Sequence, residues 1–150
     1  MPRLLVSFLL VVGLFVPFAA GGEESLSAGE ERAINTVIQA QINAFKNHDA
    51  DAAFALAAPG IQAKFQTAEN FISMVATQYL PLYSPKRTEF LGLVADGAAV
   101  IQRVKVVGPD DNEYIAYYPM ERQENGSWKI GGCYIEPVTE PDTSAPEIDA

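Results

Sequence analysis

The sequence contains one cysteine, Cys133, and one histidine, His48, which are the residue types most often involved in nucleophilic catalysis. A reactive cysteine needs a base within hydrogen-bond reach, but His48 ends a predicted helix and Cys133 lies in a predicted strand far along the chain. We therefore interpret Cys133 as a small apolar residue inside a strand. The two residues also supply too few ligands for a structural zinc site, so we predict no catalytic residues, no metal and no cofactor.

The distribution of charge argues against a nucleic-acid partner. Nineteen acidic residues face ten basic ones, for a formal net charge of −9 at pH 7, and no basic face is available to neutralise phosphates. The acidic excess gathers at the two ends of the chain, at Glu23, Glu24, Glu136, Glu140, Asp142, Glu147 and Asp149. We interpret residues 137–150, which contain prolines and several of these acids, as a disordered tail.

The N-terminal segment has the three parts of a secretory signal peptide. Arg3 precedes an apolar run that extends to Phe18, and the small residues Ala19 to Gly22 follow. The run is shorter than the roughly 20 apolar residues that cross a bilayer as a helix. We predict that residues 1–21 are a cleaved signal peptide and that the mature protein has no stable membrane insertion. An uncleaved membrane anchor is the alternative.

The first predicted element of the domain is a long amphipathic helix from about Ala28 to Asn47. Ser27 and Glu30 have the spacing of a capping box, with serine at the cap and glutamate three residues later. Its apolar residues recur at helical spacing, at Ile34, Ile38, Ile42 and Phe45. This stripe predicts that one face of the helix packs on a flat layer.

Shorter helical segments follow. Asp49 is placed to cap a helix over residues 50–57, residues 61–65 predict one further turn, and Thr67 precedes a helix whose apolar stripe includes Met74 and Tyr79. Residues 80–87 contain prolines at positions 81 and 85. We expect these prolines to exclude a helix there.

After Arg87 the apolar residues alternate with a period of two, which is typical of strands. The segments TEFLGLVA, AAVIQRVKVV, EYIAYYPMERQ and SWKIGGCYI predict four strands, separated by turn sequences at residues 96–97, 108–112 and 125–126. Helices followed by an antiparallel meander predict an α+β domain over residues 27–136.

The turn at Asn125-Gly126 determines which side chains of the last hairpin face the core. A two-residue loop would place Trp128 on a polar face. A three-residue loop with Gly126 in a left-handed conformation pairs Trp128 with Arg122 and collects the apolar residues on one face, so we prefer it. The same alternation, carried on, places Tyr134 opposite Ala116.

The register of the other strands follows from the same alternation. It places Gln102 opposite Tyr118. A three-residue loop at residues 95–97 would set Glu89 against Arg103 and Phe90 against Gln102.

The inner face of this sheet mixes valines with a glutamine and tyrosines, a composition typical of ligand sites. We predict a pocket for a small apolar ligand or a peptide, whose wall contains Gln102, Tyr118, Trp128, Tyr134, Tyr114 and Tyr79. The alternative is that these side chains fill the core, with Gln102 hydrogen-bonded to Tyr118 because a buried amide needs partners.

Three helices followed by a curved antiparallel sheet resemble the cone-shaped, cystatin-like fold of the nuclear transport factor 2-like (NTF2-like) superfamily. The segments IQAQINAFKNHDADAAFALAAPGIQAKF, ENFISMV, YLPLYSP, QRVKV and GSWKIGGC, in this order, resemble an uncharacterised bacterial family known as domain of unknown function 4864. The resemblance covers about residues 34–135. It implies a sheet of four or more strands wrapped around the first helix, and an exported protein, which we place in the periplasm of a Gram-negative bacterium.

The family has no established activity, so three functional hypotheses stay open. The first, which we favour, is a non-catalytic domain that binds a small ligand or another protein. The second is a pocket enzyme of the ketosteroid isomerase or dehydratase type, which would need a carboxylate in the pocket; Asp49 and Asp51 could reach its mouth, although Asp49 is explained as a helix cap. The third is a homodimeric structural module that pairs through the outer sheet face, at Tyr117, Ile115 and Ile135.

Overall fold

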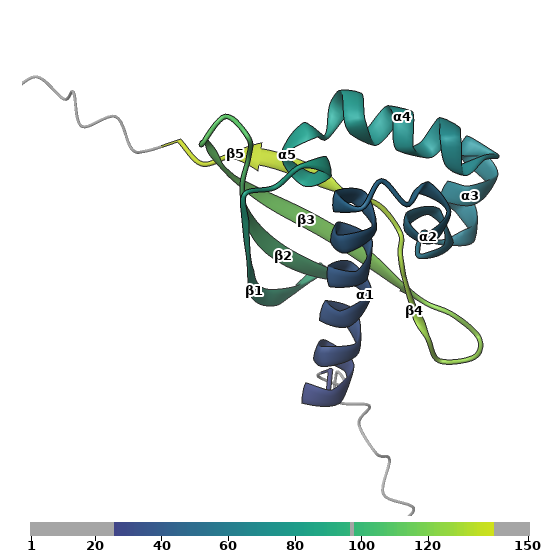
Figure 1. The fold of residues 1–150 in the computed structure, drawn as a ribbon. Coiled ribbons are helices and arrows are strands. Elements are labelled where there is room, and N and C mark those ends of the chain that lie inside the picture. The colour runs from purple at the N-terminus through teal and green to yellow at the C-terminus, as the bar shows by residue number, and fades with distance from the viewer. Residues whose placement is uncertain (1–25, 97, 140–150) are drawn as a thin grey trace, which may run out of the picture.

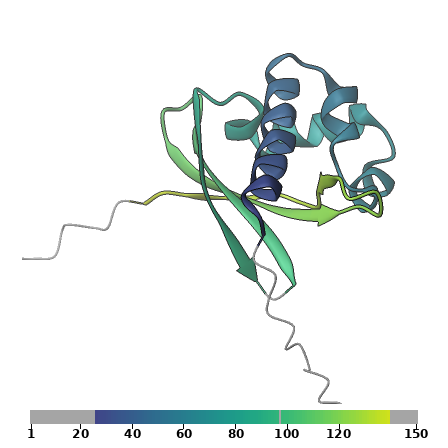
Figure 2. The same cartoon turned by 90° about the horizontal axis from the view of Figure 1, so that it is seen from below.

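A computed structural model describes residues 26–96 and 98–139. Five helices precede five strands along the chain: α1 (Ala28–Lys46), α2 (Ala50–Ala55), α3 (Pro59–Phe65), α4 (Ala68–Gln78), α5 (Leu80–Tyr83), β1 (Arg87–Asp96), β2 (Ala99–Val107), β3 (Glu113–Arg122), β4 (Trp128–Ile130) and β5 (Tyr134–Pro137). The strands form one curved antiparallel sheet, and α1 lies across its concave face (Figures 1 and 2). The predicted α+β architecture is confirmed.

The long helix forms as its sequence predicts. The Ser27 side chain accepts a hydrogen bond from the Glu30 backbone N–H, and the Glu30 carboxylate accepts one from the Ser27 backbone N–H, which completes the capping box. Ile38 and Ile42 have no exposed surface and pack against the inner face of the sheet. Each such buried side chain contributes about 1.5–3 kcal/mol to folding, so this stripe anchors α1 on the sheet.

The prediction that the prolines exclude a helix after α4 is wrong. Residues Leu80–Tyr83 form the single-turn helix α5, with Pro81 in its first turn. The backbone N–H groups of a first turn have no partner within the helix, so the missing N–H of proline costs nothing there. Leu82 is buried in the main core. The turn ends at Ser84, directly before Pro85, as the residue preceding a proline disfavours helical geometry.

The centre of the sheet has the predicted register. Gln102 lies opposite Tyr118 in the β2–β3 pair. In the β3–β4 pair Arg122 lies opposite Trp128, as the three-residue loop requires. Gly126 has a φ of 84°, a conformation that residues with a Cβ rarely adopt.

The predicted register of the β1–β2 hairpin is wrong. Glu89 lies opposite Lys105, and Phe90 lies opposite Val104. The pairing shifts between Phe90 and Leu93, and Asp96 pairs with Ala99, so the loop has two residues instead of three. The shift is a bulge, which leaves the carbonyl of Leu91 free to accept a hydrogen bond from the buried Gln102 amide.

The last predicted strand is in fact two strands with different partners and register. β4 ends at Ile130, and β5 resumes with Tyr134 opposite Tyr117 and Ile135 opposite Ala116. The predicted Tyr134–Ala116 pair is therefore wrong by one residue. This shift turns Tyr134 to the outer face, where it is 44% exposed, and turns Ile135 onto the core. Ile135 thus does not belong to the outer face, where we expected it.

The break between β4 and β5 has a local cause. A strand residue directs its N–H and C=O to the same neighbour, and Pro119 of β3 directs its C=O to the Gly131 N–H at 2.7 Å. Because proline has no N–H, β3 offers no donor on this side at that position. On the opposite edge of β4, the Ile130 N–H donates to the Leu56 carbonyl, at 3.0 Å, and the Ile130 carbonyl accepts from the Ala58 N–H, at 2.8 Å.

The ends of the described structure can be compared with the predicted domain boundaries. Pro137, where we predict the acidic tail to begin, is the last residue of β5 and lies opposite Tyr114. The predicted signal peptide and residues 140–150 lie outside the described residues. In the described part, no helix is long and apolar enough to cross a membrane.

Candidate functional site

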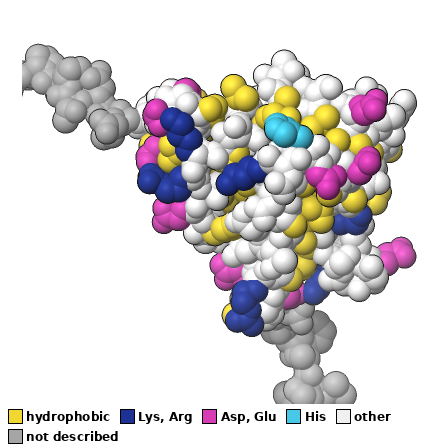
Figure 3. All heavy atoms as spheres, in the orientation of Figure 1, with side chains coloured by type: hydrophobic (Ala, Val, Ile, Leu, Met, Phe, Trp, Pro, Cys, Tyr) yellow, Lys and Arg dark blue, Asp and Glu magenta, His cyan; other side chains and the backbone are white. Residues whose placement is uncertain are grey.

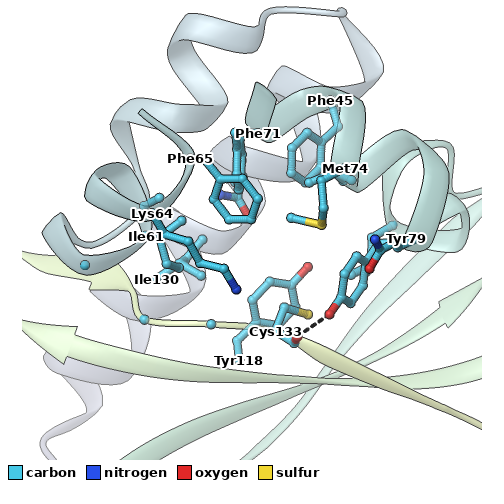
Figure 4. A pocket seen from close by; sticks show the side chains of 18 of the residues that line it. Phe45, Ile61, Lys64, Phe65, Phe71, Met74, Tyr79, Tyr118, Ile130 and Cys133 are labelled. Atoms are coloured by element: carbon cyan, nitrogen blue, oxygen red, sulfur yellow. Dashed lines mark hydrogen bonds between the residues drawn. The ribbon is translucent and has the colours of Figure 1, made fainter. Parts of the chain in front are cut away.

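A cavity of about 560 Å³ opens between the short helices and one end of the sheet (Figure 4). Side chains of α1, α3 and α4 form its roof. Its floor consists of Tyr118 of β3 and the irregular segment between β4 and β5. The lining residues are Gln41, Phe45, Ala57, Gly60, Ile61, Lys64, Phe65, Phe71, Met74, Val75, Gln78, Tyr79, Leu82, Tyr118, Glu121, Ile130, Gly131, Gly132 and Cys133.

The roof is held by an aromatic cluster on three helices. Phe71 of α4 is central: its ring centroid lies 6.2 Å from that of Phe45 in α1 and 5.7 Å from that of Phe65 in α3. Thr67 caps α4 by accepting a hydrogen bond from the Asn70 backbone N–H at 3.1 Å. The cluster and the cap together fix the angle at which α4 presents Met74 to the cavity.

Two polar side chains lie at the floor, Tyr118 and Cys133. Tyr118 is 1% exposed, and among the described residues its Oη has no hydrogen-bond partner. Burial raises the pKa of Tyr118 well above its usual value and also raises the pKa of the Cys133 thiol. Cys133 is partly exposed as a residue, and the protein atoms around its thiol account for the raised pKa. Both groups are therefore protonated at neutral pH.

Tyr79 ties the helical layer to the break in the sheet. It follows α4 directly, and its Oη donates a hydrogen bond to the backbone carbonyl of Cys133 at 3.0 Å. Burial raises the pKa of Tyr79, with a smaller contribution from the Cys133 side chain. This hydrogen bond satisfies a carbonyl that no sheet partner takes up.

The mouth of the cavity carries one charge of each sign. Lys64 of α3 is exposed, and its Nζ lies 5.4 Å from the ring centroid of Phe65. Glu121 is also exposed, and its side chain lies over Gly131, where an added Cβ would come within 2.9 Å of Glu121 Cγ. Glu121 is the only carboxylate among the lining residues within the described part of the chain.

Comparison with known proteins identifies the family but no activity. Residues 27–143 match the profile of the family "Domain of unknown function (DUF4864)". The chain belongs to the DUF4864 family. No curated protein matches it.

A solved structure supports the fold assignment. The DUF4864 domain is similar to the crystal structure of an NTF2-like protein of unknown function from Shewanella baltica OS155. The TM-score is 0.52 and the identity 13%, over 77% of this chain and 99% of the other. At this identity the likeness concerns the fold alone, and it confirms the predicted NTF2-like fold.

In the DUF4864 domain, Tyr79 and Tyr118 are the two predicted pocket residues that line the cavity. Gln102 is buried beside the β1 bulge, where its Nε2 donates to the carbonyls of Leu91 and Arg103. The expected hydrogen bond between Gln102 and Tyr118 does not form: Gln102 Oε1 and Tyr118 Oη both lack partners among the described residues.

The other three predicted residues lie elsewhere on the sheet. Trp128 is buried, with the Arg122 guanidinium 5.3 Å from its ring. Tyr114 donates a hydrogen bond from its hydroxyl to Asp110 at 2.8 Å, next to the β2–β3 turn. Tyr134 lies on the outer face and stacks on Tyr117, at a centroid distance of 4.7 Å.

Sequence reasoning missed the helical side of the cavity and Cys133. The stripe of α4 contains Phe71 and Met74, but nothing in its spacing shows that the facing layer is hollow. One signal was present: Gly131-Gly132 follows β4, and its partner strand contains Pro119. A glycine pair facing a proline indicates an interrupted ladder, and the interruption exposes this end of the inner face.

The residues considered for catalysis do not meet at the cavity. Asp49 caps α2 by accepting a hydrogen bond from the Ala52 N–H at 3.0 Å, and Asp51 is exposed. His48 Nδ1 lies 2.8 Å from the Tyr83 hydroxyl. None of these lines the cavity. Within the described ranges, no three histidine, cysteine or acidic residues are grouped closely enough to hold a metal ion.

Proposed function

We propose that the DUF4864 domain is a non-catalytic binding module that holds a small, largely apolar molecule in the cavity above Tyr118. One observation carries the proposal: an open apolar cavity ends on a buried tyrosine hydroxyl without a hydrogen-bond partner in the described chain. Ligand sites have this composition, with apolar walls and a few placed polar groups, and volumes of about 300–1,000 Å³.

The pattern of packing supports this proposal. Beneath α1 the inner face is filled by fully buried side chains such as Ile38 and Val104. Beneath α3 and α4 the facing residues Ile61, Phe65 and Met74 are only partly buried, although they are large and apolar. Partly buried apolar side chains around a concave surface gain contacts when an apolar molecule occupies it.

A cavity-filling substitution tests the proposal. Met74→Trp adds bulk inside the cavity, whereas Ser73→Trp adds the same side chain at an exposed neighbouring position of α4. The probe is 2-isopropenylnaphthalene, an uncharged aromatic hydrocarbon, and its binding is measured by equilibrium dialysis. We expect Met74→Trp to weaken binding about tenfold or more and Ser73→Trp to leave it unchanged. Equal affinities for both variants would remove the cavity as the site.

A retained natural ligand would identify the molecule itself. Native mass spectrometry of the mature protein, purified from its own host, would report a bound species as an added mass. We expect the added mass in the wild type and in Ser73→Trp, and its loss in Met74→Trp. An added mass that persists in Met74→Trp would place the ligand elsewhere.

A second candidate function is self-association through the outer face of the sheet. The register shift of β5 places Tyr134 beside Tyr117, as a nearly parallel pair with an interplanar angle of 9°. Tyr134 remains 44% exposed there. Sedimentation at several concentrations tests the pairing, with Tyr134→Lys as the disrupting variant and Ser73→Lys, at an exposed position of α4, as a charge-matched control. A wild type that stays monomeric at high concentration would end this candidate.

We also propose that the chain is exported and that residues 1–21 are removed. The support is the order of charged, apolar and small residues at the N-terminus, followed within a few residues by the capped start of α1. The intact mass of protein from a Gram-negative periplasm would show a chain that begins at Gly22. A full-length mass in the membrane fraction would indicate an uncleaved anchor instead.

A further inference from the structure

The floor of the cavity presents one hydrogen-bond donor, the Tyr118 hydroxyl, that has no oxygen or nitrogen acceptor among the described residues. Tyr118 is 1% exposed, and its hydroxyl points toward the space among Phe71, Met74 and Tyr79 (Figure 4). Buried polar side chains are nearly always hydrogen-bonded, so an exception of this kind calls for an explanation. A bound molecule with a hydrogen-bond acceptor near this hydroxyl would explain it.

The polar neighbours of this hydroxyl are already engaged. Tyr79 Oη donates to the Cys133 carbonyl at 3.0 Å. Cys133 Sγ donates, weakly, to the Tyr134 carbonyl at 3.8 Å. The Cys133 sulfur lies beside the Tyr118 hydroxyl but is only a weak acceptor, and no oxygen or nitrogen atom of the described residues accepts from this hydroxyl. A ligand oxygen would therefore be a stronger acceptor for the Tyr118 O–H than the protein supplies. A ligand that satisfies it must carry a hydrogen-bond acceptor at its buried end.

The surroundings of the floor disfavour negative charge. The charged lining residues, Lys64 and Glu121, are both exposed at the mouth. Burial raises the pKa values of Tyr118 and of the Cys133 thiol, which reports the same penalty on an anion at this depth. A carboxylate placed against Tyr118 would be buried, and burial of a charge is costly unless a cation pairs with it. Among the described lining residues Lys64 is the cation, and its side chain extends toward Tyr118 in Figure 4, but Lys64 is exposed and its ammonium stays hydrated.

We infer that the ligand is an uncharged, mostly apolar molecule that places an acceptor oxygen, such as a carbonyl, against the Tyr118 hydroxyl. The inference rests on the proposed function and names the class of molecule for the same cavity. Because Tyr118 is enclosed, a lining side chain moves to admit the acceptor. Met74, which extends from α4 toward Tyr118 in Figure 4, is unbranched and changes rotamer at low cost.

Two probes of equal shape test the inference on the mature protein. In 2-acetylnaphthalene a carbonyl oxygen takes the place of the CH₂ group of 2-isopropenylnaphthalene. We expect the ketone to bind about tenfold more tightly in equilibrium dialysis, the effect of one net hydrogen bond. Tyr118→Phe should abolish this preference while it retains affinity for the hydrocarbon. Tyr79→Phe, the matched control, removes a hydroxyl that is already used and should keep the preference.

The outcomes separate this inference from the proposed function. Equal binding of the two probes, or a preference that survives Tyr118→Phe, would overturn the inference and leave the cavity as a binding site. Binding of neither probe would overturn both. The anion 2-naphthoate should bind more weakly than the ketone. If 2-naphthoate binds more tightly, and Lys64→Met removes that advantage, the site selects an anion and the inference of an uncharged ligand is wrong.

Discussion

The inner face of the sheet is filled at one end and hollow at the other. Beneath α1, Ile34, Ile38 and Ile42 meet Val104 and Val106 without exposed surface. Beneath α3 and α4, the same face ends on Tyr118 and opens into the cavity. The difference lies in the covering layer. One long helix lays a continuous stripe along the curved sheet, whereas short helices joined at angles cannot follow the curve and leave a space.

The tight packing that stabilises the fold therefore lies beneath α1, and the open surface that could bind a ligand lies beneath α3 and α4. Partly buried side chains around the cavity, such as Met74, remove less apolar surface from water than the fully buried side chains beneath α1 and therefore contribute less to stability. Charged side chains of both signs are interspersed on the face shown in Figure 3. The binding specificity that we propose therefore depends on the cavity and its floor rather than on the charged exterior.

The largest expected difference between the two ends appears on truncation to alanine. Ile38→Ala removes a fully buried side chain of the filled end and should lower the free energy of unfolding by about 2–5 kcal/mol. Met74→Ala, at the hollow end, should lower it by less than about 1 kcal/mol, because Met74 is partly exposed and already borders empty space. Urea denaturation measures both. Similar losses at the two sites would mean that the two ends are equally well packed.

The hollow end should also make stability depend on alkaline pH. The folded-state pKa of the Cys133 thiol is raised above its ordinary value of 9.0, so the unfolded chain loses this proton first. The stabilisation that comes from this raised pKa is fully present below about pH 9. Above that pH the free energy of unfolding falls by up to about 1.4 kcal/mol per pH unit, because the unfolded chain loses the thiol proton and the folded chain keeps it. Cys133→Ala should flatten the decline between pH 9 and 10. An unchanged slope in urea denaturation would show that the thiol is not enclosed.

Replacing each of the two cavity tyrosines with phenylalanine should affect the free energy of unfolding differently. Tyr118→Phe removes a buried hydroxyl that has no partner in the described chain, and should leave the free energy of unfolding unchanged or raise it by about 1 kcal/mol. Tyr79→Phe breaks the hydrogen bond to the Cys133 carbonyl and should lower it by about 1 kcal/mol. A loss for Tyr118→Phe as large as that for Tyr79→Phe would indicate that Tyr118 has an acceptor after all.

The smallest expected effect is at the mouth. Lys64→Met keeps the aliphatic length of the side chain and removes an exposed charge. We expect the free energy of unfolding to change by less than about 0.5 kcal/mol, because exposed charges contribute little to stability. Thermal unfolding checks this. A larger change would mean that Lys64 belongs to the packed structure and not to the rim of a cavity.

The regular parts of the fold could be predicted from the sequence, because their determinants are local. The capping box at Ser27 and Glu30 and the stripe of α1 specify the long helix. The loop before Trp128 sets the β3–β4 register, and uninterrupted alternation carries the register through β2 and β3. Two of the six predicted wall residues, Tyr79 and Tyr118, line the cavity.

The errors occur at a turn, at interruptions of a strand and at a proline. The β1–β2 loop is shorter than predicted and lies later in the chain, which displaces the register of that hairpin, and the bulge at Leu91-Gly92 then shifts the register by one residue. The break after Ile130 also shifts the register by one residue, and alternation alone cannot locate such shifts. As a result, Tyr134 lies on the outer face of the sheet and not on the inner face, where we expected it. The sequence predicts a helix break at Pro81, but this proline occupies the first turn of α5, where proline is tolerated.

The sequence by itself determined the class of fold, the length and inward face of α1, and the side chains along the central strands, because caps, turns and periodicity act over a few residues. Only the tertiary structure decided that the inner face is hollow at one end, and that Tyr118 meets Cys133 and Met74 there. These residues belong to segments far apart in the chain. Whether they close-pack or enclose a space depends on how short helices cover a curved sheet, which no local pattern records.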